Sequence, residues 1–237
     1  MTVTGARRVT LRRAAIAALL VVLGLGSVAG VLFLAAFQFR LEWFADPSAM
    51  VAAGPGSAEL LRWAAVADLL SWYLAIAVVA YVVWMALRPL GPALADLATL
   101  GALGYVLAGG AAATALAFVG PRLMHEYASA EDPAAVAVAF GVLAEVVFRA
   151  IWQFLDAWLL AGWWLGVGLA MLRVQPGFAR LSLALAALAG VGSIFTLLDI
   201  AIARYTGLAL FFVLWTVWTI WLLVLLWRRR PPFTTLG

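Results

Sequence analysis

Long apolar runs separated by short polar links dominate this sequence. A helix crosses a bilayer with about 20 consecutive apolar residues, and six runs reach that length: 14–37, 64–87, 94–118, 151–172, 181–203 and 206–227. The runs lack the alternation of apolar and polar positions that is typical of a barrel strand, and they are longer than such a strand. The pattern predicts an all-α membrane protein with six transmembrane helices, in a single polytopic domain over residues 1–237.

The region around the fourth run is too long for one span. From Pro133 to Arg173 no proline or paired glycine interrupts the chain, and about forty helical residues would reach roughly twice the hydrocarbon thickness. Because "AAVAVAFGVLA" is apolar, we expect 134–149 to form a helix that lies at the outer interface or packs back on the bundle. The fourth span would then begin near 150, with a corner at "AEVVFRAIWQFLDAW", residues 144–158.

Composition agrees with a lipid environment. The chain is 67% hydrophobic and 11% charged, with a mean hydropathy of +1.10, whereas a soluble domain is nearer half apolar and a quarter charged. The arginines flank the spans unequally, with Arg7, Arg8, Arg12, Arg13, Arg88, Arg173, Arg180, Arg228, Arg229 and Arg230 on one side and Arg40, Arg62, Arg122 and Arg204 on the other. This asymmetry predicts that both termini are cytoplasmic. We expect a multi-pass protein of the inner (cytoplasmic) membrane, with the lipid bilayer and no nucleic acid as partner.

The residue inventory limits the chemistry. All 15 basic residues are arginine, so no lysine can form a Schiff base, and the absence of cysteine excludes disulfides and thiolate sites. A single histidine excludes a haem with two histidine ligands from one chain. His125 stands near Glu126, Glu131 and Asp132, which could ligate a divalent metal, but one histidine in a predicted loop is usually just solvated. We expect no cofactor, no bound metal and no catalytic residue.

Three aspartates lie inside the predicted spans, where ionisable groups are costly and usually face the protein interior or a cavity. Counting from the nearest cytoplasmic arginine places Asp68, Asp156 and Asp199 about 25–30 Å from it, at 1.5 Å per residue. Three helices therefore carry an acid at a similar depth, near the outer edge of the hydrocarbon.

The segment 144–158 adds a polar stripe. Glu145, Arg149, Gln153 and Asp156 fall within roughly 80° of arc if the helix is continuous, and Glu145 precedes Arg149 in the favoured i,i+4 order. We expect the stripe to meet the other two aspartates. The candidate ligand-binding cluster is Asp68, Glu145, Arg149, Gln153, Asp156 and Asp199.

Three functions fit such a cluster. We favour a non-enzymatic protein whose outward-opening cavity binds, and could transport, a small polar or cationic ligand or protons, although transporter sites usually lie nearer the bilayer midplane. Alternatively, the acids form an ion-pair network with Arg62, Arg149 and Arg204 that fastens helices together. The chain would then be a membrane subunit or regulator of a larger homo- or hetero-oligomeric complex. A catalytic carboxylate pair is the third alternative, without a nucleophile and base to support it.

The last predicted span carries an aromatic stripe of Phe211, Trp215 and Trp218, continued by Leu222. Aromatic walls can hold organic cations, but such rings more often form belts at membrane interfaces or pack inside a bundle. Glycine pairs at 26/30 and 162/166 allow close contact between helices or subunits.

The link between the predicted fourth and fifth spans reads "GLAMLRVQPGFARLSLALAALAG". Its helix–P-x-x-x-R-x-S–helix pattern, around Arg173, Pro176, Arg180 and Ser182, resembles the turn in an uncharacterised family of bacterial six-helix integral membrane proteins, defined only as a domain of unknown function. The similarity covers roughly 60–225 at the level of hydropathy and loop placement. It implies the fold and the membrane location but no activity, because none is assigned to that family.

Overall fold

A computed structural model of the protein describes the backbone of residues 3–40, 43 and 47–236, and the side chains of 10–40, 43, 48–200 and 210–234. All regular structure in these ranges is helical. In chain order the elements are α1 (Val3–Ala36), the 3-10 helix η2 (Pro47–Ala53), α2 (Pro55–Asp68), the π-helix η3 (Leu69–Leu74), α3 (Ala75–Leu87), α4 (Pro92–Ser129), α5 (Pro133–Ala144), the π-helix η4 (Glu145–Leu155), α6 (Asp156–Met171), α7 (Pro176–Leu197), α8 (Ala201–Trp227) and the 3-10 helix η5 (Phe233–Leu236).

Six helices in the described part of the chain are long and apolar enough to cross a membrane, which confirms the predicted number. They run over Thr10–Ala36, Pro55–Leu87, Pro92–Ser129, Pro133–Met171, Pro176–Leu197 and Leu210–Trp227. The predicted span 181–203 was wrong at its end, because α7 stops at Leu197 and α8 begins at Ala201.

Prolines define where four of the helices begin. They stand in the first turns of α2, α4, α5 and α7, as Pro55, Pro92, Pro133 and Pro176. A proline at this position is favoured because its ring already has a helical φ and the missing N–H would have no partner there. At α5 the Asp132 side chain also accepts hydrogen bonds from two backbone N–H groups of the first turn, at 3.1 and 3.2 Å.

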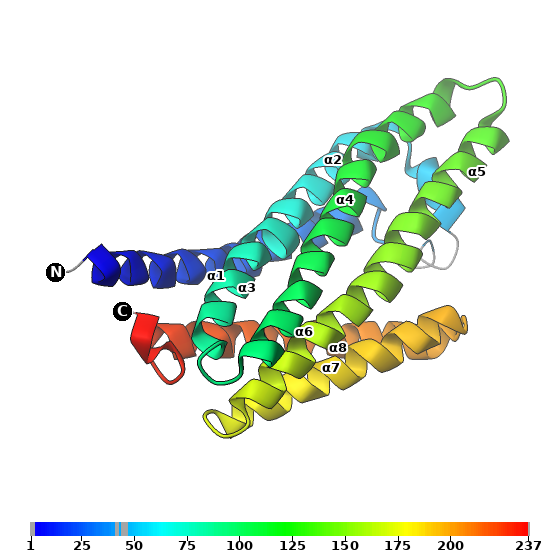
Figure 1. The fold of residues 1–237 in the computed structure, drawn as a ribbon. Coiled ribbons are helices and arrows are strands. Elements are labelled where there is room, and N and C mark those ends of the chain that lie inside the picture. The colour runs from blue at the N-terminus through cyan, green and yellow to red at the C-terminus, as the bar shows by residue number, and fades with distance from the viewer. Residues whose placement is uncertain (1–2, 41–42, 44–46, 237) are drawn as a thin grey trace.

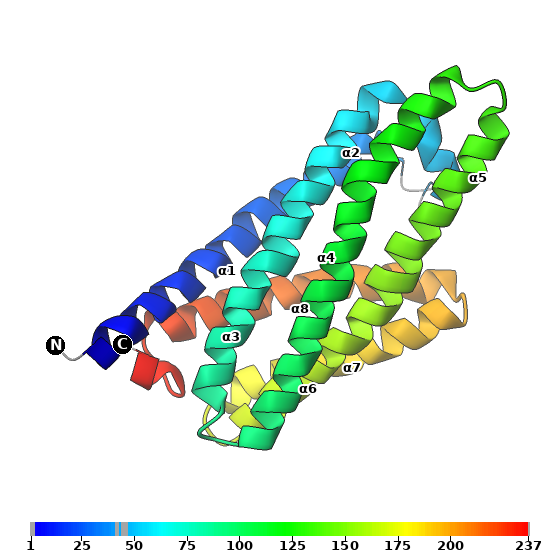
Figure 2. The ribbon, with the colours of Figure 1, turned by 45° about the horizontal axis from the view of Figure 1, so that its top comes forward.

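The corner expected at 144–158 was wrong. The elements α5, η4 and α6 follow one another without interruption from Pro133 to Met171, and Figures 1 and 2 show them as a single rod. The sequence contains no residue that would end a helix there, and the extra length is accommodated because α5 packs on the bundle, against α4 and η2.

The helix α4 is central to the bundle. It packs against α2, α3, α5 and α6, and both π-helices contact it. The hairpin of α7 and α8 packs on α6 through α7 and on α1 through α8. Both termini lie near the α3–α4 and α6–α7 turns, and far from the α4–α5 and α7–α8 turns (Figures 1 and 2).

Two apolar cores fill the bundle. One joins buried residues of α1, α3, α4, α6, α7 and α8 and contains the large side chains of Trp163, Trp164 and Trp218. The other joins the end of α1, η2, α2, the second half of α4 and α5, and contains Phe37 and Phe140. Along the continuous helix of α2 and η3, the second core ends just before Asp68 and the first begins just after it. The first acid of the candidate cluster therefore lies where the two cores meet.

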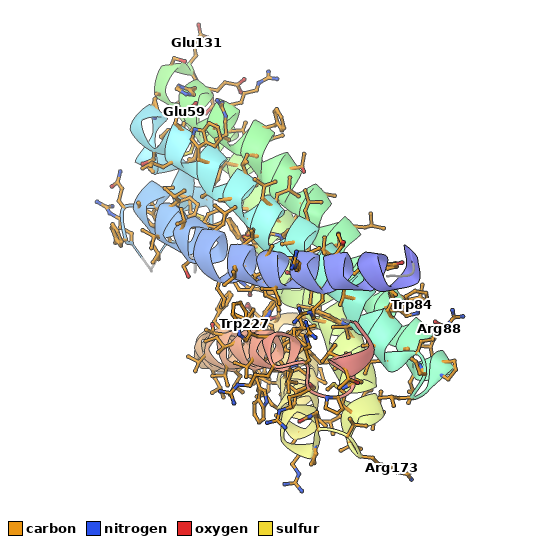
Figure 3. All side chains as sticks on the ribbon, turned by 90° about the vertical axis from the view of Figure 1, so that its left-hand side faces the viewer. Glu59, Trp84, Arg88, Glu131, Arg173 and Trp227 are labelled. Atoms are coloured by element: carbon orange, nitrogen blue, oxygen red, sulfur yellow. The ribbon has the colours of Figure 1, made fainter. Side chains whose placement is uncertain are left out.

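The outer surface combines exposed apolar side chains with charged ends. Leu107 and Phe118 are both 74% exposed, as expected for a helix surface that is solvated by lipid. Figure 3 shows Glu59 and Glu131 at one end of the molecule and Arg88 and Arg173 at the opposite end.

Candidate functional site

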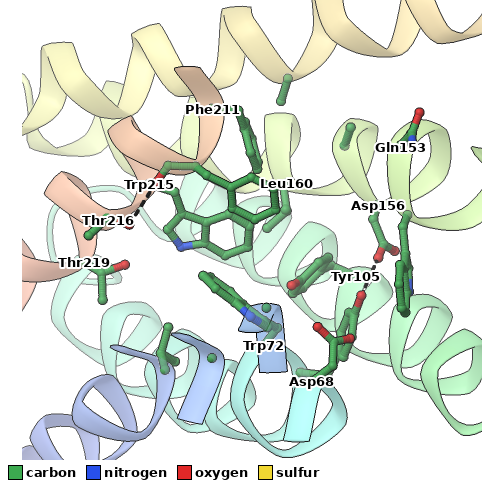
Figure 4. A pocket seen from close by; sticks show the side chains of 18 of the residues that line it. Asp68, Trp72, Tyr105, Gln153, Asp156, Leu160, Phe211, Trp215, Thr216 and Thr219 are labelled. Atoms are coloured by element: carbon green, nitrogen blue, oxygen red, sulfur yellow. Dashed lines mark hydrogen bonds between the residues drawn. The ribbon is translucent and has the colours of Figure 1, made fainter. Parts of the chain in front are cut away.

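A cavity of about 650 Å³ extends into the bundle from its surface, because exposed side chains such as Val31 and Phe212 line it together with buried ones. It is bounded by α1, η3, η4, the start of α6, α7 and α8, and α4 reaches it through Tyr105. Figure 4 shows Asp68, Tyr105 and Asp156 on one side of this cavity. We call this side the acidic end, and it comprises Asp68, Tyr73, Tyr105, Gln153 and Asp156.

Both aspartates of the acidic end stand at a junction between α-helix and π-helix. Asp68 is the last residue of α2 before η3, and Asp156 is the first residue of α6 after η4. The backbone N–H of Asp156 donates to the Ile151 carbonyl, five residues back, and the N–H of Ala75 donates to the Leu70 carbonyl in the same way. A π-turn contains one residue more than an α-turn, and such segments are frequent at functional sites.

Tyr73 joins the two helices at the acidic end, because its hydroxyl donates a hydrogen bond to Asp156 Oδ2 at 3.2 Å. The pair lies directly against the backbone of α4 at Gly109, where a Cβ would collide with the Tyr73 ring and with Asp156 Oδ2. The Tyr105 ring packs beside Tyr73, with 4.9 Å between the ring centroids. The absence of a side chain at Gly109 is therefore what lets the two helices meet at this hydrogen bond.

Three other polar atoms of the acidic end are unsatisfied within the described residues. Asp68 Oδ2, Gln153 Oε1 and Asp156 Oδ1 are buried and have no hydrogen-bond partner within the described residues. Among the side chains that the structure describes, no arginine forms an ion pair with Asp68 or Asp156. Since an unpaired carboxylate is very unfavourable in an apolar interior, the acidic end must hold protons or a cation.

Aromatic rings form the wall beside the acidic end. The centroid of the Trp72 ring lies 4.6 Å from that of Trp215, and Phe211 lies 5.3 Å from Trp215. Trp72 packs on α1 at Gly26, where a Cβ would come within 3.0 Å of the indole. The predicted aromatic stripe on α8 thus faces inward, and Trp215, Trp218 and Leu222 are buried.

The other three residues of the predicted cluster lie at the surface. Arg149 Nη2 donates to Asp199 Oδ1 at 2.6 Å, and Arg149 Nη1 lies 3.6 Å from Glu145 Oε2. The Asp199 side chain is 66% exposed and that of Arg149 is 33% exposed. We call these three residues the surface trio. It ties η4 to the turn between α7 and α8, beside Thr196, which also lines the cavity.

The placement of Asp199 inside a span was wrong, because this residue lies in the turn between α7 and α8. Its φ is +57°, and the backbone bonds from Asp199 N–H to the Thr196 carbonyl and from Ile200 N–H to the Phe195 carbonyl form a Schellman motif. Aspartate tolerates this left-handed conformation better than most residues do. The conformation of Asp199 therefore allows α7 to end at Leu197, inside an apolar run.

The structure thus divides the single predicted cluster into two groups. Asp68, Gln153 and Asp156 belong to the cavity, and the surface trio lies outside it. The four residues of the predicted polar stripe do not share one face, because the rotation of 100° per residue of an α-helix does not apply through the π-helix η4. Arg62, an expected partner of the acids, pairs instead with Glu59 at 2.8 Å, and the side chain of Arg204 lies outside the described residues.

Sequence reasoning missed Tyr73, Tyr105 and Gly109. Tyr73 follows Asp68 by five residues, a spacing that brings two side chains onto one face of a π-turn but not of an α-helix. The adjacent glycines Gly109 and Gly110 were an available signal, because paired glycines in a span allow a neighbouring helix to approach closely.

The acidic residues near His125 do not form a metal site in the structure. His125 lies within α4 rather than in a loop, and Glu126 accepts a hydrogen bond from Arg122 at 2.7 Å. Within the described ranges, no three metal-ligating side chains are grouped.

Comparisons of the chain with protein families, with curated proteins and with solved structures found no match. The resemblance to the bacterial six-helix family stays a prediction.

Proposed function

We propose that this chain is an integral membrane protein that binds a small cationic ligand in the cavity, with Asp68 and Asp156 as the negative end of the site. The observation that carries the proposal is the pair of carboxyl groups at one end of an apolar cavity, without an ion-pair partner among the described side chains. A bound ammonium group would supply the missing positive charge.

The aromatic wall favours an organic cation over a metal ion. A cation near the face of a tryptophan ring is stabilised by about 0.5–2 kcal/mol, with the larger values where water is excluded. Trp72 and Trp215 both line the cavity, and Figure 4 shows Trp72 between Trp215 and Asp68. A Ca²⁺ ion without bound water would require about six to eight oxygen ligands, more than the two carboxyl groups and one glutamine amide provide.

Protons compete with the ligand in this proposal. When the cavity is empty, the carboxyl groups are neutralised by protons, and a cation that enters displaces them. The dissociation constant of the cation should therefore increase as the pH falls. Coupled release of protons would also allow the protein to transport the ligand across the membrane in exchange for protons.

We further propose that both termini are cytoplasmic, that the membrane is a bacterial inner membrane, and that α5 lies toward the outer interface. The support is the arginine distribution. Arg88 and Arg173 stand at the end of the molecule where the two termini also lie (Figures 1 and 3), and arginine accumulates on the cytoplasmic side of membrane proteins.

Direct binding tests the proposal. Isothermal titration calorimetry of the purified protein in detergent micelles would compare 4-phenylbutylamine with the neutral 4-phenylbutan-1-ol. We expect the amine to bind at least about tenfold more tightly, because a charge-assisted hydrogen bond contributes about 1.5–3 kcal/mol. Asp156→Asn and Asp68→Asn should each remove this preference.

Asp199→Asn is the matched control, because it removes the same charge from the surface trio. It should leave amine binding unchanged. Equal affinity for amine and alcohol in the wild-type protein, or an amine preference that survives in both cavity variants, would contradict the proposal.

The alternative, a structural ion-pair network, fits only part of the predicted cluster. Arg149 with Glu145 and Asp199 fastens η4 to the α7–α8 turn. We therefore assign this fastening role to the surface trio and ligand binding to the acidic end.

A further inference from the structure

Two hydrogen-bond donors on α8 are unpaired at the cavity wall. Trp215 Nε1 and Thr219 Oγ1 are buried and have no hydrogen-bond partner within the described part of the chain. Both residues line the cavity, and Trp215 is 3% exposed and Thr219 1% exposed. Figure 4 shows the indole nitrogen and the hydroxyl facing the same space beside Trp72, away from Asp68 and Asp156. We call Trp215 Nε1 and Thr219 Oγ1 the donor pair.

Neighbours on the same helix show what such groups normally do. The Trp218 indole N–H donates to the Ser182 hydroxyl at 2.9 Å. The Thr216 hydroxyl donates to the carbonyl of Phe212, four residues back, at 2.9 Å, and the threonines at 99, 114 and 196 make the same backbone bond. In the donor pair, the indole N–H has no side-chain acceptor and the threonine hydroxyl does not bond to the carbonyl four residues back, although both residues are about as deeply buried as Trp218.

Buried donors are nearly always paired in folded proteins, and those that are not require an explanation. The donor pair belongs to the same cavity as the acidic end but lies on its other side. An acceptor oxygen that reaches this point would satisfy both groups. The cavity would then recognise two chemically different ends of one molecule.

We propose that the ligand is an organic amine with an apolar body and an acceptor oxygen at its far end. This inference rests on the proposed function, because the ammonium group occupies the acidic end. The body lies against Trp72 and Phe211, and an ether, carbonyl or hydroxyl oxygen accepts from the donor pair. A site with buried donors rejects analogues that lack the acceptor, because the donors then stay unpaired.

Calorimetry with matched probes tests this arrangement. Phenylalkylamines and (4-methoxyphenyl)alkylamines with the same number of methylene groups differ only in the methoxy group that carries the ether oxygen, and a series of chain lengths covers the span between the two ends. At the best length we expect the methoxy compound to bind about threefold to tenfold more tightly than its unsubstituted partner. Shorter and longer homologues should lose this preference.

Variants of the donor pair give the decisive comparison. Thr219→Val keeps the shape but removes the hydroxyl, and Trp215→Phe removes the indole N–H. In each variant the methoxy compound and its unsubstituted partner should therefore bind with more nearly equal affinity. Thr219→Ser keeps the hydroxyl and should retain the preference. Thr216→Val is the control, because the Thr216 hydroxyl already bonds to the backbone.

The outcomes separate the two proposals. If the amines bind through Asp68 and Asp156 but no chain length shows a methoxy preference, the donor pair has no role in recognition and this inference is overturned, while the proposed function stands. A methoxy preference that survives in both Thr219→Val and Trp215→Phe would overturn the inference in the same way. If amines bind no better than the matching alcohols, the proposed function itself fails.

Discussion

The acidic end of the cavity and the surface trio both contain two carboxyl groups, but they neutralise them differently. In the surface trio, Arg149 lies between Glu145 and Asp199, and all three side chains are partly exposed. At the acidic end, the described residues provide Asp156 with one tyrosine hydroxyl and Asp68 with no ion-pair partner. The exposed group is complete within the chain, whereas the buried group requires a proton or a cation from outside.

Whether the polar groups find partners within the chain distinguishes a structural contact from a candidate binding site. Depth in the membrane distinguishes them less clearly. A polar network that only fastens helices satisfies its own members, since unsatisfied buried groups oppose folding. Unsatisfied groups around a cavity are therefore evidence for a function that offsets their cost. Removal of one carboxylate charge from each of the two groups should accordingly have opposite effects on stability, whereas loss of the packing or hydrogen bonding around the acidic end should destabilise the fold.

The largest effect is expected at Gly109. Gly109→Ala places a methyl group where the Tyr73 ring and Asp156 Oδ2 now lie, so the acidic end must move or the helices must separate. Overpacking of this kind lowers the free energy of unfolding by about 1–3 kcal/mol. Thermal unfolding in one detergent would measure it against Gly162→Ala, a control with open space around the new Cβ. Equal melting temperatures for the two variants would mean that α4 is not tightly packed on the acidic end.

A smaller loss is expected from Tyr73→Phe, which removes the hydroxyl that donates to Asp156. Deleting one neutral hydrogen bond costs about 0.5–1.5 kcal/mol. Tyr81→Phe is the matched control, because Tyr81 is 44% exposed and stacks on Trp84 at the outside of the bundle. If the two variants melt at the same temperature, the Tyr73–Asp156 bond does not stabilise the fold.

The smallest effects are expected when single charges are removed. Asp156→Asn should leave the melting temperature unchanged or raise it, because asparagine can accept the Tyr73 hydrogen bond without a buried charge. A drop equivalent to about 3–5 kcal/mol, the usual result of breaking a buried ion pair, would show that Asp156 has a cationic partner in the fold.

Asp199→Asn should instead lower stability slightly, by about 0.2–1 kcal/mol, as for other exposed ion pairs. Asparagine also tolerates a positive φ, so this variant isolates the charge from the turn. Added salt should abolish the difference from wild type, because exposed pairs are screened. A salt-independent loss would contradict the assignment of Asp199 to an exposed ion pair.

The number and order of the helices could be predicted from the sequence, because solvation by lipid demands runs of about 20 apolar residues. The cavity acids could be predicted too, since Asp68 and Asp156 are conspicuous in apolar helices. Their partners could not, because the sequence carries no periodic signal for a π-turn. The α-helical spacing therefore placed Arg149 with Asp156, whereas the structure places Tyr73 there.

The turn at Asp199 illustrates a second limit. The apolar run continues through "LLDIAIA", so hydropathy alone extended the fifth span to residue 203. The helix ends earlier because a short backbone motif satisfies its last carbonyls. Such a motif depends on local backbone conformation, which is independent of the hydrophobic pattern.

The two π-helices also bear on how such a site could arise. A π-turn is what an α-helix becomes when one residue is inserted and the flanking turns keep their places. Removing one residue from η3, which is six residues long, would restore regular α-helix and rotate Tyr73 away from the cavity, while the apolar outer surface of the bundle stayed intact. In an ancestral bundle of this kind, the Tyr73–Asp156 hydrogen bond at the acidic end could therefore appear or vanish through the gain or loss of a single codon.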